Sequence, residues 1–500
     1  MKDRIARLIR HLTPSGTVVQ QTAKSGIWRL ATNVSSRSLQ LLMLIILARL
    51  LEPRHFGLMG IALVTLSATR KFTDIGLNAA LIQQHRDNVD DYLDTTWCLE
   101  IARGVLILTV LYLLAPVIAG AFGEPEATLP IQIIALGPLL VGLQNPGVVY
   151  FYKHLEFHKD FTYRASGGLV QLIVGVSYAL VSPTVWALVF AFLARDAVEL
   201  ILSYFLHPYR PWPRFDFAAA SELIHYGKWI TGSSMIQFLY SEGDDAFVGW
   251  YLTATALGFY QYAYRLADAP STEVSEVIAQ VMFPTFAKLQ GDVAALREAL
   301  LQTLRLTGFV TFPMAFGIAL VAPSFVPAIL GPEWTPMIPV LQLLALYGLL
   351  HAITRNFGSL WKAIDRPDLT AKLPLVGLVG IAICIWPMTA RWGIVGTALA
   401  VILPSLVVLF PLNVYVTATL VECKTWDIYR EYAYPFVAAS AMFGILWYAR
   451  LVLSLPALVE FLLLIPAGAA IYLGVALLLE RRFGWGIEEN LRTVLEGITS

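Results

Sequence analysis

Runs of about twenty predominantly apolar residues recur along the 500-residue chain, and a run of that length is what an α-helix needs to cross a lipid bilayer. Hydrophobic residues make up 57% of the sequence and charged residues only 14%, whereas a soluble domain carries roughly a quarter charged residues. The sequence therefore predicts an all-α polytopic membrane protein with about fourteen transmembrane helices. The predicted helices lie near residues 26–50, 56–82, 97–122, 128–151, 162–182, 184–206, 223–252, 256–282, 299–322, 336–361, 369–390, 393–418, 432–450 and 457–479.

Lysine and arginine are concentrated in alternate connections between the predicted helices. By the positive-inside rule these connections lie in the cytoplasm, which places both chain ends there. The basic, amphipathic segment at residues 1–16 is expected to lie on the cytoplasmic membrane surface rather than to cross it. The basic residues assigned to the cytoplasmic side are Lys2, Arg4, Arg7, Arg10, Lys24, Lys153, Lys159, Arg210, Arg214, Lys288, Arg297, Lys362, Arg366, Lys372, Lys424, Arg430, Arg481 and Arg482.

The connections are short, which excludes several classes of protein. None can hold a nucleotide-binding domain and no G-x-x-x-x-G-K-[ST] phosphate loop is present, so we do not expect ATP hydrolysis. Formal net charge is zero, which gives no indication of a nucleic-acid partner. Cys98, Cys384 and Cys423 are too scattered for a disulfide framework or a metal cluster and are expected to be free thiols. We expect no cofactor and no metal centre.

An internal repeat appears when the sequence is shifted by 201 positions. Gly26-x-Trp28 then falls on Gly227-x-Trp229, and Phe56-Gly57-Leu58 falls on Leu257-Gly258-Phe259. Parallel repeats of this kind are a known plan of transporters, with the binding site between the halves. The repeat predicts two six-helix pseudo-symmetric lobes and an extra C-terminal helix pair. The expected boundaries are 1–215 for the N-terminal lobe, 216–420 for the C-terminal lobe and 421–500 for the extra pair with a cytoplasmic tail.

Polar residues form a stripe on the first predicted helix, because they recur at intervals of three and four. The stripe consists of Arg29, Asn33, Ser36, Arg37 and Gln40. It favours a cationic wall that attracts phosphate or acidic sugar, since guanidinium offers fixed paired donors to such groups. The alternative is helix packing, or, for Arg29, snorkelling to the cytoplasmic surface.

Residues 223–270 contain acidic residues within an apolar helix pattern, where an ionised side chain costs several kcal/mol unless it is paired or hydrated. Gln237 and Tyr240 continue the polar face, and Glu242, Asp244 and Asp245 follow. Such a cluster can exchange a proton or coordinate sodium, which indicates a transport pathway. The alternative is that the acids pair with Arg265 or lie at the outer headgroup level.

Further charged residues lie on the eighth and tenth predicted helices. Arg265 and Asp268 either contact a substrate or pair with each other, and Arg355 extends the cationic path. Glu100 with Arg103, and Arg195 with Glu199, are separated by three or four residues, so we interpret them as structural pairs.

Several segments resemble the polysaccharide transport family, the Wzx-type flippases, within the superfamily that also holds multidrug and toxin extruders and the lipid II flippases. The matching stretches are LARLLEPRHFGLMGIAL at 47–63, FTDIGLNAALIQ at 72–83, GDDAFVGWYLTATALGFYQYAYRLADAP at 243–270, VMFPTFAKLQGD at 281–292 and LVAPSFVPAILGPEWTPMIPVLQLLALYGLLHAI at 320–353. The resemblance implies two lobes around a cavity that opens alternately to each side of a bacterial or archaeal inner membrane. It also implies a polyprenyl-pyrophosphate-linked oligosaccharide as substrate, and it allows a polymerase or export complex as partner.

The residue patterns and the resemblance together predict a flippase that is not an enzyme and is coupled to H+ or Na+. Tyr240 and Tyr260 are expected to stack on sugar faces. A multidrug or organic-cation antiporter is the alternative, and a membrane-embedded glycosyltransferase is disfavoured by the short connections. The predicted substrate-binding residues are Arg29, Asn33, Arg37, Gln40, Gln237, Tyr240, Arg265 and Arg355. The predicted ion-coupling residues are Glu242, Asp244, Asp245 and Asp268.

Overall fold

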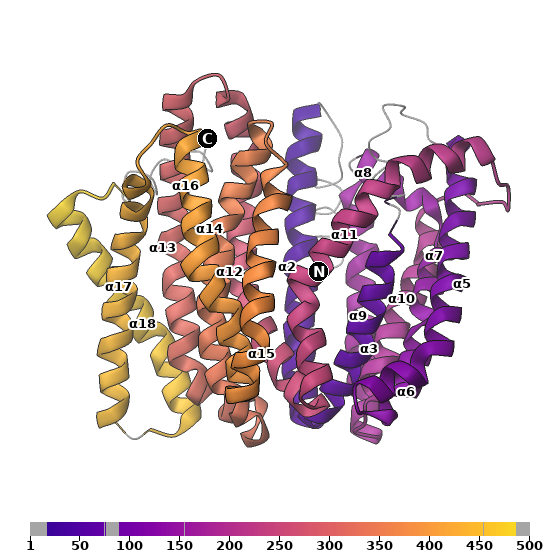
Figure 1. Ribbon diagram of the computed structural model, residues 1–500, viewed down its shortest axis with the longest axis horizontal. Helices are drawn as coiled ribbons and strands as arrows, with labels where there is room; N and C mark the ends of the chain where they lie inside the picture. Colours follow the sequence, from indigo (N-terminus) through magenta and orange to yellow (C-terminus); the bar gives the residue numbers. More distant parts are fainter. Residues whose placement is uncertain (1–17, 75, 77–89, 155, 454, 487–500) are drawn as a thin grey trace, which may run out of the picture. The chain divides into compact units, whose positions relative to one another are not determined.

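The computed structural model describes residues 18–74, 76, 90–154, 156–453 and 455–486, and within these ranges it is helical without a strand (Figure 1). Nine helical segments of this described part are long and apolar enough to cross a membrane. Each of the fourteen predicted segments has a helical counterpart, while the number of crossings stays a prediction. The basic N-terminal segment and residues 77–89 lie outside the described residues.

The chain forms two compact units. Unit 1 comprises residues 1–242 and 249–258, and unit 2 comprises residues 243–248 and 259–500. The first helices are α2 (Val18–Leu50), α3 (Pro53–Phe72), α5 (Asp90–Ala121), α9 (Phe157–Val181), α10 (Trp186–Leu206), α11 (Phe217–Tyr251) and α12 (Ala254–Leu289). The later helices are α13 (Val293–Phe325), α14 (Ile338–Ala363), α15 (Leu369–Pro404), α16 (Phe410–Leu420), α17 (Thr425–Val452) and α18 (Ala457–Phe483). The lobe boundaries predicted at 215 and 420 stay a prediction.

In unit 1, α9 packs against both α2 and α10 (Figure 1). A Cβ on Gly175 of α9 would lie 3.1 Å from the Cβ of Ala191 on α10, so two small residues let these helices approach closely. On the other side of this unit α5 packs against α7 (Leu136–Gly142). The three helices α2, α9 and α10 are the ones that matter for the site.

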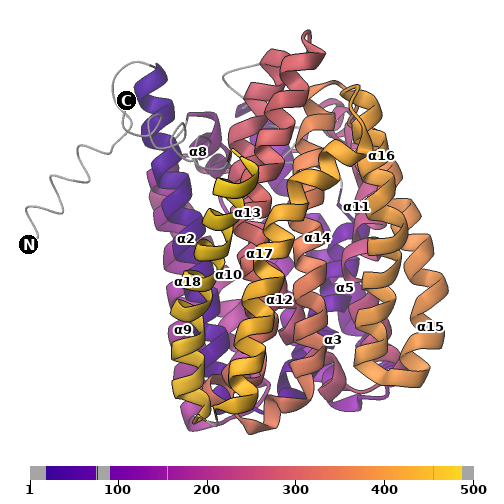
Figure 2. The ribbon, with the colours of Figure 1, turned by 90° about the vertical axis from the view of Figure 1, so that its left-hand side faces the viewer.

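In unit 2, α13 packs against α14, α17 and α18, and Figure 2 shows the last two helices running beside it. Two polar contacts fix this arrangement. The Tyr472 hydroxyl donates to the Phe309 carbonyl at 2.7 Å, and Arg305 forms an ion pair with Glu431 at 2.8 Å. The C-terminal helix pair is therefore anchored through α13.

The single helix predicted over 128–151 is wrong. The structure has η1 (Pro125–Ala127), α6 (Thr128–Ile134), α7, η2 (Pro146–Val148) and α8 (Val149–Lys153) instead. Proline cannot donate a backbone hydrogen bond. At Pro146, the side chain of Asn145 instead caps the following turn by accepting from the Gly147 amide at 2.9 Å.

Two other boundaries also have local causes. Helix α3 ends at Phe72, with Thr73 as its cap, whereas the predicted boundary was residue 82. Helix α15 contains a break at Gly393, whose φ of 56° and ψ of −136° are non-helical. This break confirms the predicted division between residues 390 and 393.

The sequence repeat has a physical counterpart in unit 1. A Cβ on Gly57 would lie 1.6 Å from the carbonyl oxygen of Ala254, and a Cβ on Gly258 would lie 2.2 Å from the carbonyl oxygen of Pro53. Residues 53 and 254, like residues 57 and 258, are related by the shift of 201. Each of the two glycines therefore meets a backbone carbonyl in the other copy of the repeat. Reciprocal contacts of this kind are typical of pairs related by a two-fold axis.

The chain contains a second repeat that is not found by shifting the sequence by 201 positions. Ala-Pro precedes a left-handed glycine in both units, Pro116 before Gly123 (φ 68°) and Pro323 before Gly331 (φ 129°). A 3-10 helix follows each glycine. The second copy is one residue longer, and η3 (Val326–Leu330), a π-helix, absorbs the insertion.

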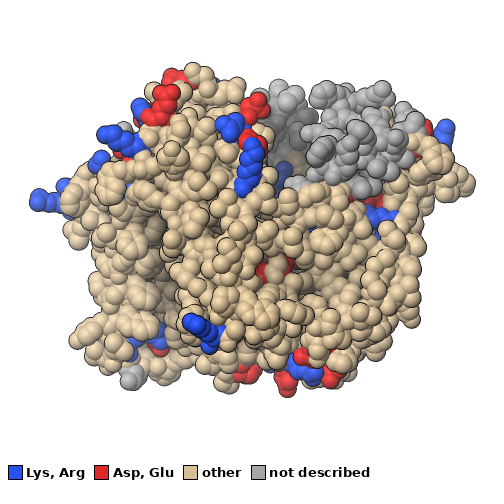
Figure 3. All heavy atoms as spheres, in the orientation of Figure 1, with Lys and Arg blue, Asp and Glu red and all other residues tan. Residues whose placement is uncertain are grey.

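Charged side chains of both signs lie near the ends of the helices on the face shown in Figure 3, and the band between them is mostly uncharged. This distribution is the one expected for helices that cross an apolar layer.

We predict that Gly57→Ala lowers the free energy of unfolding by ~1–3 kcal/mol, because its methyl group would overlap the Ala254 backbone. Gly120→Ala on α5 is the control, since a Cβ there meets nothing within 4 Å. The measurement is the melting temperature of the purified proteins. Equal melting temperatures for the two variants would show that the close backbone contact is absent.

Candidate functional site

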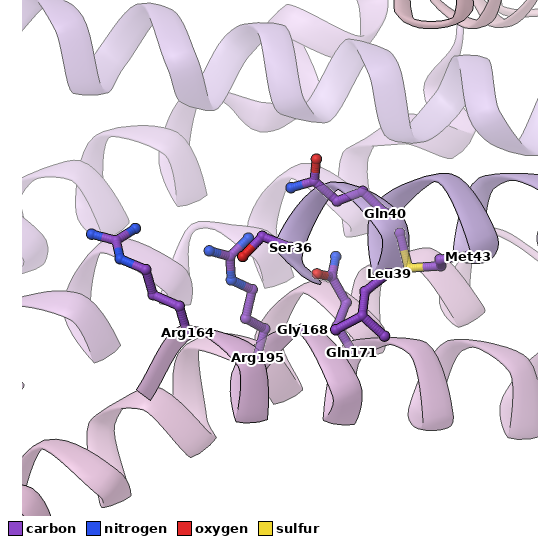
Figure 4. Close-up of a pocket in the computed structure, with 8 residues that line it drawn as sticks. All are labelled: Ser36, Leu39, Gln40, Met43, Arg164, Gly168, Gln171 and Arg195. Carbon is purple, nitrogen blue, oxygen red and sulfur yellow. The ribbon is translucent and has the colours of Figure 1, made fainter. Parts of the chain in front are cut away.

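A polar pocket lies in unit 1 among α2, α9 and α10 (Figure 4). In Figure 4 the side chains of Arg195 and Gln171 extend from their helices toward the α2 segment that carries Ser36 and Leu39. Polar residues make up most of the lining, although all three helices are largely apolar. The lining residues are Ser36, Leu39, Gln40, Met43, Arg164, Gly168, Gln171 and Arg195.

The predicted stripe on α2 contributes only part of its length to this pocket. Ser36 and Gln40 line it, and Arg37 donates from Nη1 to Oε1 of Gln40 at 3.3 Å. Arg29 and Asn33 are exposed and lie outside the lining, and the Arg29 guanidinium stands 5.8 Å from the ring centre of Phe157. The structure therefore divides the stripe into a pocket half and an outer half.

Arg164 is a pocket residue that the sequence analysis missed. It donates to Asp160 at 2.9 Å and to the Tyr152 hydroxyl at 2.7 Å. The spacing of four residues between Asp160 and Arg164 was the available signal, because it is the spacing of an ion pair on one helix face. The adjacent Gly167-Gly168 leaves room beside it for the neighbouring helices.

Arg195 and Glu199 form the structural pair that their spacing predicted, with Nε donating to Oε1 at 2.9 Å. Glu199 is buried, and a Cβ on Gly167 would lie 2.7 Å from its Oε1, so this glycine makes the space for the carboxylate. Arg195 also lines the pocket, which the sequence analysis did not anticipate. The same guanidinium thus faces a buried acid and a polar cavity.

The neighbouring Asp196 is held differently. Its Oδ2 lies 3.9 Å from Nη2 of Arg70 on α3, and both atoms are buried without a hydrogen bond. A Cβ on Gly137 of α7 would lie 2.9 Å from Asp196 Oδ2. This second carboxylate therefore faces α3 and α7, and it does not line the pocket.

The pocket chemistry suits an anion. Two guanidinium groups provide planar sets of N–H donors that match carboxylate and phosphate oxygens. Gln40, Gln171 and Ser36 add neutral hydrogen-bonding groups. No group of three His, Cys, Asp or Glu residues that could hold a metal ion occurs in the described part of the chain.

The acids of α11 do not converge on one point. Glu242, in unit 1, accepts from Ser67 of α3 at 2.7 Å. Asp244 and Asp245, in unit 2, accept from the Tyr260 hydroxyl at 2.7 Å and from Gln261 at 3.0 Å. The hydrogen bonds that these three acids accept from Ser67, Tyr260 and Gln261 come from neutral side chains.

The prediction that Tyr260 stacks on a sugar face is wrong. Its side chain is fully buried and its hydroxyl is committed to Asp244. The two other predicted residues nearby are more accessible, since Gln237 is exposed and Tyr240 is half-buried.

Helices α12 and α14 of unit 2 share a charged seam. Asp268 faces His351 at 3.5 Å, and Arg355 forms an ion pair with Glu276. Asp268 therefore has a partner, His351, that the spacing along its own helix did not predict, because His351 lies on the helix packed against it. The Arg265 side chain is exposed.

This seam is narrow because Gly348 of α14 brings the two backbones together. A Cβ there would lie 2.9 Å from the carbonyl oxygen of Ala267. Further along, Ser359 donates to the Ala279 carbonyl at 3.0 Å. The ion pair of Arg355 is thus built into a close helix contact. Cys98, Cys384 and Cys423 are free thiols, as predicted.

Comparison with known proteins identifies the family. The sequence profile described as "Polysaccharide biosynthesis protein" matches residues 46–339, more than half of the chain. The chain belongs to this family. The lipopolysaccharide biosynthesis protein WzxC of Escherichia coli is 28% identical over 71% of the chain and 72% of its own length. The probable low-salt glycan biosynthesis flippase Agl15 of Haloferax volcanii is 24% identical over 91% of the chain and 96% of its own length.

A solved structure supports the fold of this polysaccharide biosynthesis protein. The lipid II flippase MurJ, in an inward closed conformation, superposes with a TM-score of 0.72. The match covers 91% of the chain and 99% of MurJ at 14% sequence identity. At that identity the likeness shows the fold alone, which is the all-α polytopic architecture predicted from the sequence.

We predict that Tyr260 and Asp244 are energetically coupled. Tyr260→Phe removes one hydrogen bond from a buried carboxylate, and Asp244→Asn removes the charge that strengthens that bond. In a double-mutant cycle, melting of the purified variants should give a coupling energy of roughly 0.5–3 kcal/mol. Additive effects of the two substitutions would contradict this contact.

Proposed function

We propose that this protein is a flippase that moves polyprenyl-pyrophosphate-linked oligosaccharides from the cytoplasmic to the outer leaflet of the bacterial inner membrane. The product serves extracellular polysaccharide or lipopolysaccharide biosynthesis. The observation that carries the proposal is the unit 1 pocket, where Arg164 lies on α9, a helix long and apolar enough to cross a membrane, and Arg195 lies on the adjacent helix α10. Membrane-embedded charges of this kind are characteristic of substrate pathways.

The names of the relatives support the same class of function. WzxC is named for lipopolysaccharide biosynthesis, and Agl15 is named a probable flippase in glycan biosynthesis. The described chain also consists of helices with short connections. A transporter needs no more than this, whereas a glycosyltransferase needs an additional domain to hold its sugar substrates.

Substrate binding would begin with the anionic groups. The pyrophosphate or an acidic sugar would bind at the pocket half of the α2 stripe, where Gln40 lines the pocket together with Arg195 and accepts a hydrogen bond from Arg37. Exposed residues of the stripe would contact the rest of the head group, while the prenyl tail stays in lipid. The proposed contacts outside the pocket are Arg29, Asn33, Gln237, Tyr240, Arg265 and Arg355.

Alternating access would be biased by an ion, H+ or Na+. The proposed sites are Glu242, Asp244, Asp245 and Asp268, whose carboxylates have hydrogen-bond or ion-pair partners on neighbouring helices. An ion shifts the equilibrium between two conformations only if it binds one of them more tightly. Both chain ends would lie in the cytoplasm, and a polymerase or export complex would receive the flipped product.

Reconstitution tests this proposal. The purified protein in liposomes, given a labelled polyprenyl-pyrophosphate oligosaccharide, should expose the label on the opposite leaflet in a proton- or sodium-gradient-dependent manner. Arg37→Ala should reduce the rate roughly tenfold or more, because losing a charge-assisted hydrogen bond removes about 1.5–3 kcal/mol. Protein levels should be unchanged.

Arg49→Ala is the matched control, since Arg49 is an exposed arginine in the last turn of the same helix and lies outside the pocket. Its transfer rate should equal that of the unmodified protein. Efflux of organic cations without transfer of any lipid-linked oligosaccharide would contradict the proposal and favour a multidrug antiporter.

A further inference from the structure

Resting on the proposed function, we propose that the α2–α9–α10 pocket binds one anionic group of the substrate and that Glu199 takes up a proton when it does. The anionic group is either the carrier pyrophosphate or an acidic sugar carboxylate, both of which present paired anionic oxygens to a guanidinium. Three features of unit 1 carry the inference.

The first feature is the position of Arg195. Its Nε is occupied by Glu199, while its side chain also lines the pocket. A guanidinium has five N–H donors, so the two terminal nitrogens can bind a ligand. An anion in the pocket and the carboxylate of Glu199 would then share a single positive charge.

The second feature is the charge balance. The pocket arginines, Arg164 and Arg195, are each matched by one carboxylate, from Asp160 and Glu199. These two ion pairs are therefore neutral before a ligand enters, and an anion bound to their arginines leaves an excess negative charge in largely apolar surroundings. Such a charge is costly, and protonation of a nearby carboxylate removes it.

The third feature singles out Glu199 as the acceptor. Asp160 has two partners, because it accepts from the Tyr152 hydroxyl at 3.1 Å as well as from Arg164. Among the described residues Glu199 accepts a hydrogen bond from Arg195 only, and it is 8% exposed in the space left by Gly167. When a bound anion shares the positive charge of the arginine, the carboxylate of Glu199 therefore loses more of its stabilisation than the carboxylate of Asp160.

The surroundings of Glu199 hold few other charges. From α9 it is faced by Tyr163, whose hydroxyl donates to Gln144 at 2.7 Å. On its own helix Arg195 and Asp196 are adjacent, and Asp196 is directed to Arg70 of α3. Asp196 is thus the competing acceptor, and the experiment has to separate the two.

Proton uptake on binding predicts how the affinity for the anion depends on pH. Because the anion binds most tightly to protein with Glu199 protonated, its affinity should rise as pH falls. With Glu199 protonated, the anion-bound pocket also carries one negative charge fewer than it would with Glu199 ionised. The smaller net charge lowers the cost of holding a charged group within the membrane.

The test is calorimetric titration of the full-length chain in nanodiscs with sodium sulfate, whose charge does not change near neutral pH. Titrations in two buffers of different ionisation enthalpy give the number of protons taken up. We expect about one proton per sulfate bound by the unmodified protein, the value for a single titrating carboxylate. Glu199→Gln should bind sulfate with almost no uptake and with an affinity independent of pH.

Three further variants complete the design. Arg195→Ala should lose binding, whereas Arg195→Lys, which keeps the cation, should retain weaker binding with proton uptake. Glu431→Gln is the matched control, since Glu431 is equally buried and arginine-paired but lies in unit 2, so uptake should be intact. Uptake that persists in Glu199→Gln, or that is lost in Asp196→Asn instead, would overturn the proposal.

Competition identifies the source of the anion. Displacement of sulfate by methylenediphosphonate assigns the site to the pyrophosphate, displacement by glucuronate assigns it to an acidic sugar, and displacement by neither overturns the proposal. Transfer of lipid-linked oligosaccharide is measured on the same preparations. Glu199-linked uptake without transfer would refute only the proposed function, whereas transfer unaffected by Arg195→Ala would refute the pocket.

Discussion

A charge inside a bundle of apolar helices has to be balanced where it stands, and this constraint organises both units of the protein. In unit 1, Arg164 and Arg195 are each matched by a carboxylate one helical turn away. In unit 2, Arg355 is matched by Glu276 across a close helix contact. Such ion pairs are neutral before a ligand enters, so a charged ligand that binds to their arginines must change the pairing. That dependence is the basis of the proposed link between substrate and proton.

The spacing of charged residues along the chain allowed some of these ion pairs to be predicted from the sequence. Glu100 with Arg103, and Arg195 with Glu199, are close in the chain, and the structure confirms both pairs. The helices themselves follow from apolar length. The partners of Asp268 and Asp244 could not be predicted in this way, because His351 and Tyr260 are brought to them by helix packing and not by spacing.

The pocket was missed for a related reason. Its cationic residues lie on α9 and α10, and the sequence analysis examined the stripe of α2 by itself. The second repeat was missed because a one-residue insertion, absorbed by a π-helix, shifts the two copies out of register. The periodicity of one helix predicts which of its faces is polar, but it does not predict which residues of other helices pack against that face. A fixed shift likewise aligns two copies of a repeat only where neither copy contains an inserted residue.

The central claim is that the substrate's anionic group binds at Arg195 in the unit 1 pocket. The most direct test is an experimental structure of the protein in nanodiscs with a polyprenyl-pyrophosphate oligosaccharide. The account predicts density for a phosphate or carboxylate group within hydrogen-bonding distance of the terminal nitrogens of Arg195. Density for every anionic group at other arginines, such as Arg355, with the pocket empty, would contradict it.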